Sequence, residues 1–310
     1  MTHPRGKLTS IVVLNWQGWR DTLTCLASLQ KLRYPHYEVI AVDNGSEDDS
    51  VAQIRTAYPH ITVLETEYNR GFAGGNNVGI RHALSRGASY IWLLNNDTVV
   101  DPDSLEAMVA VAEADAGVGA VGVVLYDMSN PEHIQVWGGG RVNMWLGRSR
   151  YCTTPAPPDR LDYVTGASLF VRREVFERVG LLDDGFFMYW EDTDFAFRLT
   201  RAGYRMAVAE QARVWHKESA STGKDSAALD VYFNSSAVRF FKRYSRLAFV
   251  PIALGVGGKI LRRALQGDWE RARAVWYGLS ANSSALLVVQ RNPHNRKSNP
   301  SPTDSDIGET

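Results

Sequence analysis

The sequence predicts an α/β fold with a mainly parallel central sheet flanked by helices, and with a helical appendage at its C-terminal end. Three observations lead to this prediction. Short apolar runs alternate with stretches of helical periodicity over residues 8–115. The runs are nearly continuous, which is typical of parallel strands buried on both faces. Polar side chains cluster where the runs end, and open sheets of this kind bind ligands at the carboxyl ends of their strands.

The first half of the chain contains four expected strands separated by three helices. Asp43 ends the second strand, and Asn44-Gly45 forms the turn after it. The third helix ends at Gly87, because a glycine after a periodic stretch favours termination. The expected elements are strand 10–16, helix 19–32, strand 37–43, a helix within 46–58, strand 61–69, helix 76–87 and strand 89–97.

The second half is less regular. The chain from Asp225 onward is expected to be helical, and residues 291–310, with almost no large apolar side chains, are expected to form a disordered tail. The other expected elements are helix 101–114, irregular strands and a Pro-rich loop at 153–159, a strand and a helix within 163–180, a helix within 186–204 and a last strand at 205–219.

The composition is that of an ordinary globular chain. Its 34 basic and 34 acidic residues cancel, so no overall charge favours nucleic acid as a partner. Cys25 and Cys152 are too few and too far apart for a disulfide framework, and a reducing cytosol is the expected location. The longest apolar stretch, residues 247–256, covers only half of the roughly 20 residues that a spanning helix needs, so we expect no transmembrane segment.

The fourth strand ends in a run of polar side chains: Asn95, Asn96, Asp97 and Thr98. They supply the hard oxygen donors that suit Mg²⁺ or Mn²⁺ holding a diphosphate. Asp97 alone would give a metal ion only one carboxylate ligand. His216, at the end of the last strand, could supply a second ligand. Taken alone, the polar run could merely cap a turn and the histidine could be structural, so both alternatives stay open.

Polar residues that follow other strands are candidates for binding a nucleotide. Asp43 can offer its carboxylate to a nucleobase imide or to a ribose hydroxyl, although its DNGS sequence can also be only a turn. The segment at 69–79 combines glycines with amides and Arg70, which suits a close approach of backbone to phosphate. This loop lacks the glycine spacing of a dinucleotide site, and no phosphate-loop motif occurs in the chain.

Glu191, Asp192 and Asp194 form a second acidic cluster, within the sequence YWEDTDF. Its aromatic and apolar neighbours could desolvate a carboxylate and raise its pKa toward that of a general base. Acidic residues also favour the N-terminus of a helix because of the helix dipole. The two roles can coexist at this position.

Six motifs occur in an order that resembles family 2 glycosyltransferases. They are VVLNWQG, VDNGSEDDS, NRGFAGGNNVGI, LLNNDT, the segment from VTGASLF to EDTDFAFR, and VWHKESAS. The similarity spans about residues 8–220 and is closest to the bacterial subgroup that includes rhamnosyltransferases of cell-surface polysaccharide synthesis. It implies one nucleotide-diphospho-sugar transferase domain of GT-A type, dependence on Mg²⁺ or Mn²⁺, and inverting transfer by a single in-line displacement.

The resemblance also implies roles for individual residues. Asp43 matches the carboxylate that binds the base or the ribose, and Asp192 matches the catalytic base, with Glu191 orienting beside it. The implied nucleotide-sugar-binding residues are Asn15, Trp16, Asp43, Asn44, Arg70, Gly71, Asn76, Asn77, Asn95, Asn96 and Asp97, and the implied acceptor-binding residues are Gly166, Ala167 and Trp190.

The implied metal site departs from the family pattern. Asp97 matches the second carboxylate of the family's Asp-x-Asp motif, but Asn95 stands where the first carboxylate usually occurs. His216 matches a position that reaches the metal or the diphosphate in some relatives. We therefore expect Asp97 and His216 to be the metal ligands.

The resemblance divides the chain into a catalytic domain, an appendage and a tail. The expected boundaries are a catalytic domain at 1–224, with a nucleotide-binding half at 8–115 and an acceptor half at 116–224, an appendage at 225–290 and a tail at 291–310. Residues 239–291 carry ten Lys or Arg against two acidic residues. The segment 239–273 could lie on an anionic membrane surface, or the appendage could pack on the catalytic domain or on a second copy in a homodimer.

The expected reaction moves a sugar, from dTDP-rhamnose or a UDP-sugar, to a hydroxyl of a cell-surface glycan or a lipid-linked acceptor. The expected location is the cytoplasm, with a peripheral position at the inner face of the cell membrane as the finer alternative. A nucleotidyltransferase that makes the sugar nucleotide is one rival, although the turn after the first strand lacks that class's Gly-rich basic loop. A catalytically silent glycan-binding module is the other, because Asn95 replaces a carboxylate.

Overall fold

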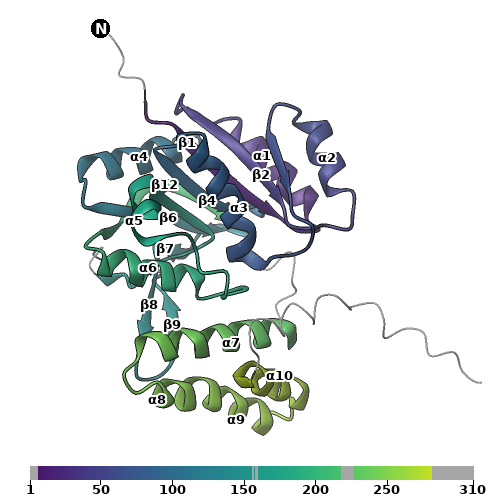
Figure 1. Cartoon of the computed structure of the whole chain (residues 1–310), viewed down its shortest axis with the longest axis vertical. Coiled ribbons are helices and arrows are strands. Elements are labelled where there is room, and N and C mark those ends of the chain that lie inside the picture. Colours follow the sequence, from purple (N-terminus) through teal and green to yellow (C-terminus); the bar gives the residue numbers. More distant parts are fainter. Residues whose placement is uncertain (1–5, 156, 158–159, 218–226, 281–310) are drawn as a thin grey trace, which may run out of the picture.

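The computed structural model describes residues 6–155, 157, 160–217 and 227–280, so the expected tail at 291–310 lies outside the described residues. Nine strands form the central sheet, in the order β3-β2-β1-β4-β11-β6-β12-β5, and β7 pairs with β6 (Figure 1). The strands are β1 (Thr9–Asn15), β2 (Tyr37–Asp43), β3 (Thr62–Glu65), β4 (Tyr90–Asn95), β5 (Thr98–Val100), β6 (Val118–Asp127), β7 (Asn130–Trp137), β11 (Ser168–Arg172) and β12 (Arg205–His216).

The four strands predicted in the first half are parallel to one another: β1 pairs with β2 and β4, and β2 pairs with β3. Their registers match Asn15 with Asp43, and Leu14 with Asn95. The polar residues that end three of these strands therefore meet at one edge of the sheet, as the sequence predicts.

The second half makes the sheet mixed. β11 lies antiparallel between β4 and β6, and β5 lies antiparallel beside β12, whereas β6 and β12 are parallel. β5 follows β4 after only two residues, so the chain turns at Asn96 and Asp97 and the two strands lie apart in the sheet. The turn leaves Asp97 at the carboxyl edge, opposite the end of β12.

Helices cover both faces of this sheet. On β1, Ile11 and Val13 point to one buried cluster and Val12 to the other, as alternation along a strand requires. One cluster includes α1 (Trp19–Leu29), α2 (Ser50–Ala57) and α4 (Ser104–Ala114). The other includes α3 (Gly71–Ser85), α5 (Arg173–Val179) and α6 (Glu191–Arg201).

The third helix begins earlier than expected. α3 starts at Gly71, so most of the segment predicted as a glycine-rich loop at 69–79 is helical. Small residues are needed there because the helix lies against the sheet: a Cβ at Gly79 would lie 2.4 Å from Val12, and one at Gly75 would lie 2.5 Å from Leu14. The glycines thus serve helix packing, which a single sequence does not distinguish from ligand approach.

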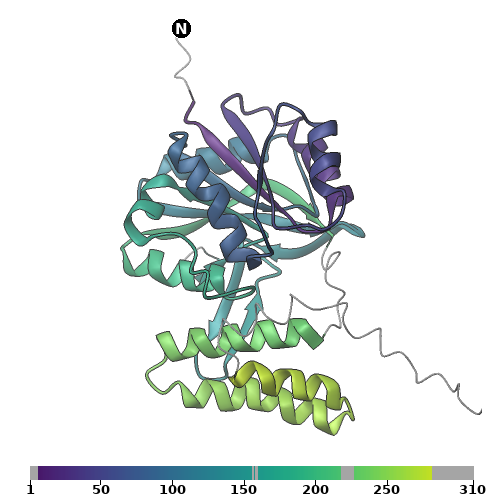
Figure 2. The same ribbon diagram turned by 45° about the vertical axis from the view of Figure 1, so that its right-hand side comes forward.

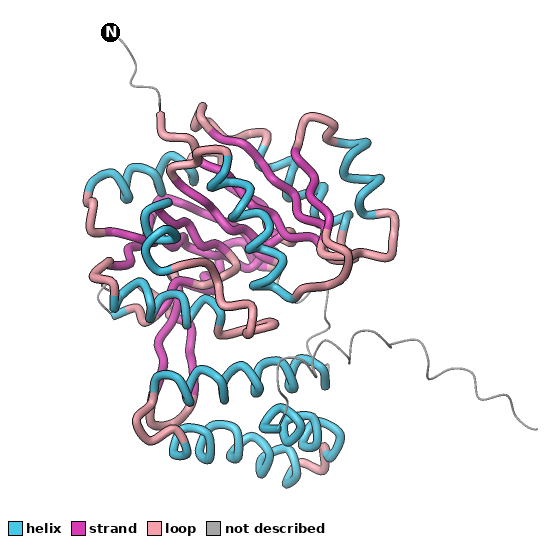
Figure 3. Tube along the Cα trace, in the orientation of Figure 1, coloured by secondary structure: helices cyan, strands magenta, loops and turns pink. Residues whose placement is uncertain are grey.

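A small sheet links the central sheet to the C-terminal helices. It has the order β10-β8-β9 and consists of β8 (Gly139–Asn143), β9 (Arg148–Tyr151) and β10 (Tyr163–Val164). The β8–β9 hairpin projects away from the central sheet toward the helical layer (Figure 3).

The C-terminal part is helical, as the sequence predicts. It forms a layer at the end of the molecule farthest from the N-terminus (Figures 1 and 2). No helix in the described part of the chain is long and apolar enough to span a membrane. The elements are α7 (Ala227–Tyr244), α8 (Phe249–Pro251), the π-helical turn η2 (Ile252–Gly257), α9 (Gly258–Leu265) and α10 (Trp269–Ser280).

Candidate active site

Asp43 is held in a hydrogen-bonded network at the end of β2. The Asn15 amide donates to Asp43 Oδ1 at 2.7 Å, and the Ser46 backbone N–H donates to Oδ2 at 2.9 Å. Thr22 on α1 donates to the Asn15 oxygen at 2.8 Å, which fixes the orientation of that amide. Asp43 and Asn15 are both buried. The carboxylate is therefore oriented before any ligand arrives, which favours a binding role.

Asn44 forms hydrogen bonds with the residues that lead into α3. Its amide nitrogen donates to Asn69 Oδ1 at 3.0 Å and to the Gly71 carbonyl at 3.1 Å, and its oxygen accepts from the Arg70 backbone N–H at 3.0 Å. These bonds present the Arg70 side chain beside Tyr68, with the guanidinium 5.9 Å from the ring centroid. Asn44 thus positions Arg70.

Asn76 and Asn77 make bonds inside the fold. The Asn76 amide donates to the Phe72 carbonyl at 3.0 Å. Asn77 donates to the Leu182 carbonyl at 2.8 Å and accepts from the Leu182 N–H at 3.1 Å. Both side chains are buried. The Asn76 bond lies within α3, whereas Asn77 joins α3 to the segment that precedes α6.

Asp97 and His216 meet at the carboxyl edge of the sheet. Asp97 Oδ1 lies 3.3 Å from His216 Nε2, and both side chains are nearly buried. Asp97 Oδ1 nevertheless makes no hydrogen bond within the described part of the chain. The Asn95 amide lies 3.4 Å from the same imidazole nitrogen. The two predicted metal ligands are therefore adjacent, and Asn95 lies beside them.

The chemistry of these atoms fits a divalent cation. His216 Nδ1 lies 2.9 Å from Gln135 Oε1, and a proton on Nδ1 donated to that oxygen leaves the Nε2 lone pair available. A lone pair on Nε2 and the carboxylate oxygen of Asp97 are then two acceptors facing each other, which a cation between them would satisfy. No group of three or more His, Cys, Asp or Glu ligands occurs among the described residues. A pair of protein ligands suits a metal that substrate phosphates also hold.

Asn96 and Trp16 lie elsewhere at this edge. The Asn96 amide donates to Thr22 at 2.9 Å and so joins the β4–β5 turn to α1. Trp16 is half-buried in the turn between β1 and α1, beside Gln17, whose φ is 52°. Among the described residues, neither side chain forms a hydrogen bond with Asp97 or His216.

Asp192 is oriented by backbone amides at the start of α6. Oδ2 accepts from the Gly166 N–H at 2.9 Å, and Oδ1 accepts from the Thr193 N–H at 2.6 Å and from its hydroxyl at 3.1 Å. Tyr189 and Trp190, just before the helix, have φ of 67° and 68°. Two bulky residues in the left-handed region are rare and costly, which is typical of functional sites.

Burial perturbs the neighbouring acid strongly. Glu191 is buried, and its Oε2 has no hydrogen-bond partner among the described residues. Burial, followed by the adjacent charge of Asp192, raises the pKa of Glu191 well above its ordinary value. Burial also raises the pKa of Asp192, while hydrogen bonds from Gly166 and Thr193 oppose that rise. Glu191 is therefore the member of the pair that keeps a proton more firmly.

Asp194, the third acid of the cluster, has a structural role in this arrangement. It is fully buried and pairs with Arg198 at 2.9 Å and with Arg243 at 2.6 Å. Arg243 belongs to α7 and also pairs with Asp183 at 2.6 Å. Asp194 therefore ties the catalytic part to the C-terminal helices.

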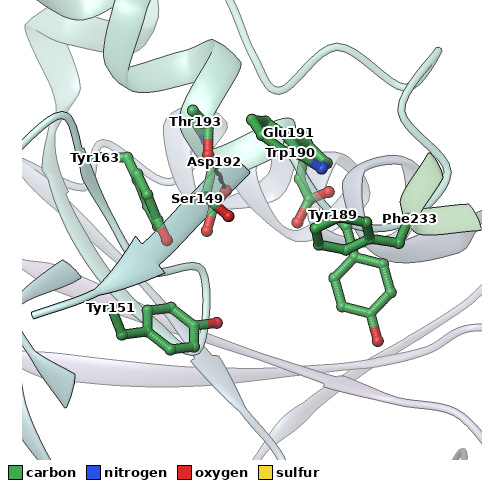
Figure 4. A pocket seen from close by; sticks show the side chains of 9 residues that line it. All are labelled: Ser149, Tyr151, Tyr163, Tyr189, Trp190, Glu191, Asp192, Thr193 and Phe233. Carbon is green, nitrogen blue, oxygen red and sulfur yellow. Dashed lines mark hydrogen bonds between the residues drawn. The ribbon is translucent and has the colours of Figure 1, made fainter. Parts of the chain in front are cut away.

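A pocket opens beside Asp192 and is lined largely by residues that the sequence does not single out. Figure 4 shows the carboxylates of Glu191 and Asp192 among aromatic side chains from three other segments. The lining residues are Ser149, Tyr151, Tyr163, Tyr189, Trp190, Glu191, Asp192, Thr193 and Phe233. Burial and the charge of Asp192 raise the pKa of Tyr163, so its hydroxyl stays a proton donor. Of the three predicted acceptor-binding residues, Trp190 lines this pocket.

Gly166 and Ala167 connect the two halves of the site. Gly166 donates to Asp192, and the carbonyl of Ala167 accepts from the Asn95 N–H at 3.0 Å. A Cβ at Gly166 would lie 3.2 Å from the Phe72 ring and 3.6 Å from Asp192 Oδ2. The segment between β10 and β11 thus positions the carboxylate of α6 relative to the end of β4, where the sequence predicts a metal motif.

Comparison with known proteins identifies the family of the chain. The family model described as "Glycosyl transferase family 2" matches residues 10–180. The N-acetylglucosaminyl-diphospho-decaprenol L-rhamnosyltransferase of Mycobacterium tuberculosis is 27% identical over 77% of this chain and 86% of its own length. The family match includes Asp43 and Asp97 and ends before Asp192 and His216.

Two solved structures share the fold. The mannosyltransferase PcManGT of Pyrobaculum calidifontis, solved with GDP-Man and Mn²⁺, superposes with a TM-score of 0.56 at 20% identity, over 91% of this chain and 79% of its own. GalNAc-T7, solved with UDP, GalNAc and Mn²⁺, superposes with a TM-score of 0.66 at 14% identity, over 94% of this chain and 59% of its own.

Fold and site together define a glycosyltransferase with the GT-A fold. The family match covers more than half of the chain, and the chain belongs to glycosyl transferase family 2. The predicted resemblance to rhamnosyltransferases and the predicted fold class are confirmed. The family match favours a glycosyltransferase over a nucleotidyltransferase that makes the sugar nucleotide.

Proposed function

We propose that the protein is an inverting, divalent-metal-dependent glycosyltransferase that moves a sugar from a nucleoside diphosphate to a hydroxyl of a lipid-linked glycan acceptor. The observation that carries the proposal is the link through Gly166 and Ala167, because it sets the carboxylate of Asp192 relative to the motif that contains Asp97. In-line displacement needs a base on one side of the reacting sugar and a diphosphate-binding site on the opposite side.

The donor would bind along the carboxyl edge of the parallel strands. Asp43, held by Asn15 and Ser46, would accept hydrogen bonds from the imide of a thymine or uracil base, or from ribose. Arg70 would supply a cation to the diphosphate. A dTDP-sugar, with dTDP-rhamnose the first candidate, or a UDP-sugar fits these groups. The rhamnosyltransferase named among the relatives supports rhamnose.

Asp97 and His216 would hold the divalent metal together with the donor diphosphate, with Asn95 as a neighbouring amide. A cation bound there, Mg²⁺ or Mn²⁺, would stabilise the negative charge that develops on the departing diphosphate. Gln135 would keep the His216 imidazole in the tautomer that presents Nε2.

Asp192 would act as the general base. Its carboxylate accepts the proton of the acceptor hydroxyl as the acceptor oxygen forms a bond to the anomeric carbon. The bond from that carbon to the diphosphate oxygen breaks with its electron pair, and attack from the opposite face inverts the anomeric centre. The amides of Gly166 and Thr193 hold the base, and the raised pKa of Glu191 favours the uncharged form of that neighbour.

The acceptor would enter the pocket between α6 and the β8–β9 hairpin. Trp190 and Tyr151 supply aromatic faces of the kind that pack on sugar rings, and Ser149 supplies a hydroxyl. The name of the mycobacterial relative describes an acceptor with a prenyl diphosphate, and we extend that class of acceptor to this chain. The place of action would be the cytoplasmic face of the cell membrane.

A donor and acceptor screen tests the proposal. The purified full chain would be incubated with dTDP-rhamnose and a set of UDP-sugars, with Mn²⁺ or Mg²⁺, and with a prenyl-diphosphate-linked N-acetylglucosamine acceptor. We expect release of nucleoside diphosphate that depends on metal and is stimulated by the acceptor, and an inverted linkage in the product. A silent binding module would release no nucleoside diphosphate with any donor, and that result would overturn the proposal.

A further inference from the structure

We infer that the outer surface of the C-terminal helices and the tip of the β8–β9 hairpin dock onto an anionic lipid bilayer. We call this surface the docking face. It consists of Trp145, Leu146, Leu254, Leu261, Leu265 and Trp269 with the cations Arg246 and Arg262. The inference deepens the proposed function, since it rests on a lipid-linked acceptor and says how such an acceptor meets the active site.

The apolar part of the docking face is unusually exposed. Leu261 and Leu265 on α9 are 62% and 80% exposed, and Trp269 at the start of α10 is 62% exposed. Leu261 and Leu265 are four residues apart, so they lie on one face of α9 and form an apolar stripe, and no residue of α9 is buried. Leu254, in η2, is 49% exposed. A stripe of large apolar side chains in water is costly, which indicates that something covers it.

The charges on these helices identify the occupant as an anionic surface. Lys242, Arg246, Arg262 and Arg273 are exposed, and none of them has a recorded ion pair in the described part of the chain. Glu270 is the only exposed acid of the described residues in α7 to α10. Apolar side chains combined with an excess of cations match a membrane interface, where each cation contributes about 1 kcal/mol near anionic lipid.

Other cations of this region form ion pairs within the fold. Arg239 and Arg243 pair with Asp183, and Arg263 and Arg271 pair with Asp230. The basic surplus noted in the sequence therefore divides into a structural set and an outward set. Two cations of the outward set, Arg246 and Arg262, belong to the docking face.

The hairpin connects the docking face to the pocket. Gly147 at its tip has φ of 62°, and a Cβ there would lie 2.0 Å from the Pro251 carbonyl oxygen. A Cβ at Gly255 of η2 would lie 2.4 Å from the Gly147 carbonyl oxygen, so tip and helix are in close backbone contact. Trp145 and Leu146 precede this contact and are 66% and 46% exposed.

The same hairpin carries Ser149 and Tyr151, which line the pocket beside Asp192. Only a few residues thus separate the apolar tip from the acceptor pocket. A bilayer held by the docking face would lie close to that pocket, and a membrane-anchored acceptor could present its hydroxyl there without leaving the lipid.

Vesicle co-sedimentation of the full chain tests the inference. The vesicles would be phosphatidylcholine alone or phosphatidylcholine mixed equally with phosphatidylglycerol. We expect the wild-type chain to sediment with the mixed vesicles and to be released by high salt. Leu261→Ser combined with Leu265→Ser should weaken that binding by at least about tenfold, because two exposed apolar side chains are lost.

The charge contribution has a matched control. Arg262→Gln should weaken binding to the mixed vesicles by about fivefold, whereas Lys31→Gln, an exposed cation in the catalytic part, should not. Thermal melting and size-exclusion chromatography of each variant would show that folding and oligomeric state are retained. Equal binding to neutral and anionic vesicles, or no sedimentation, would overturn the inference.

Two further outcomes separate this inference from its rivals. If L261S with L265S dissociates a dimer and leaves vesicle binding intact, the face belongs to a second copy and the inference is wrong. Vesicle binding needs neither donor nor transfer, so vesicle binding without any transfer would contradict the proposed function alone. Transfer to a water-soluble acceptor should be unchanged in L261S with L265S, because these residues lie outside the pocket.

Discussion

The backbone N–H of Gly166 donates to Asp192 Oδ2 at 2.9 Å, which places the carboxylate of α6 under the control of the segment before β11. The neighbouring carbonyl, of Ala167, holds the backbone of Asn95 at 3.0 Å. Two short bonds from adjacent residues therefore relate the proposed base to the proposed metal motif. Asp192 and Asn95 lie at the two ends of this link.

The two adjacent acids should respond differently to loss of charge. Asp192→Asn should lower the rate of transfer by at least about 10²-fold, because a general base contributes that much, while nucleotide binding remains. Glu191→Gln should cost less than about tenfold, because glutamine mimics the protonated glutamic acid that its raised pKa favours. Steady-state kinetics and calorimetric binding of the nucleoside diphosphate would measure both effects.

Asp49→Asn is the matched control for that comparison, since Asp49 is exposed and makes no side-chain cap bond to α2. It should leave both transfer and nucleotide binding unchanged. If E191Q instead loses activity as D192N does, or if D192N retains transfer, the assignment of Asp192 as the base is wrong.

The raised pKa of Glu191 also predicts how stability depends on pH. The folded protein retains this proton over a range in which the unfolded chain has released it, so the stabilisation is fully present below the unfolded pKa. It is lost as pH rises through the folded pKa. As pH rises above the ordinary pKa of a glutamic acid, the free energy of unfolding of E191Q should therefore rise relative to that of the wild-type chain.

Urea unfolding at a series of pH values would measure this difference. Parallel pH profiles for the two proteins would show that the pKa of Glu191 is not raised.

Asn95 should limit the affinity for metal. Its amide lies 3.4 Å from His216 Nε2, in the position of a possible second carboxylate. Asn95→Asp should therefore tighten Mn²⁺ binding by about tenfold, because ligand charge raises affinity for a divalent cation. Direct Mn²⁺ binding by electron paramagnetic resonance would measure the change independently of activity.

Asn96→Asp adds the same charge one residue away and is the control for N95D. The Asn96 amide donates to Thr22 and not to His216, so N96D should give a smaller gain in Mn²⁺ affinity. An equal gain in both variants would mean that only the local charge matters. A gain in neither would remove Asn95 from the surroundings of the metal.

Gly71 should be intolerant of a side chain. Its φ is 73°, and a Cβ there would lie 2.2 Å from the Phe187 carbonyl oxygen. Gly87 has a similar φ of 83° but nothing within 4 Å of an added Cβ. Gly71→Ala and Gly87→Ala share the cost of the left-handed backbone, about 1–2 kcal/mol, and G71A should lose at least about 1 kcal/mol more.

Chemical denaturation would compare the two alanine variants with the wild-type chain. The Phe187 segment leads into Tyr189 and Trp190, so G71A should also reduce transfer, whereas G87A should not. Equal stability losses would mean that the contact between α3 and this segment is not tight.

The apolar runs and their polar ends were enough to predict the parallel half of the sheet and the meeting of Asn15, Asp43 and Asn95 at one edge. That prediction works because parallel strands carry both properties in local sequence: continuous hydrophobicity and a common direction. His216 was predictable for the same reason, as the last residue of a strand. The acidic cluster at Glu191 was visible from its composition.

The tertiary structure decided the rest. The role of Gly166 depends on a hydrogen bond across 26 residues, and Tyr151 and Phe233 reach one pocket from a hairpin and a distant helix. The difference between Glu191 and Asp192 in how firmly each keeps a proton depends on burial and hydrogen bonds. Adjacent positions in a sequence do not reveal either property. Such contacts form between segments far apart in the chain, and local periodicity carries no information about which segments will meet.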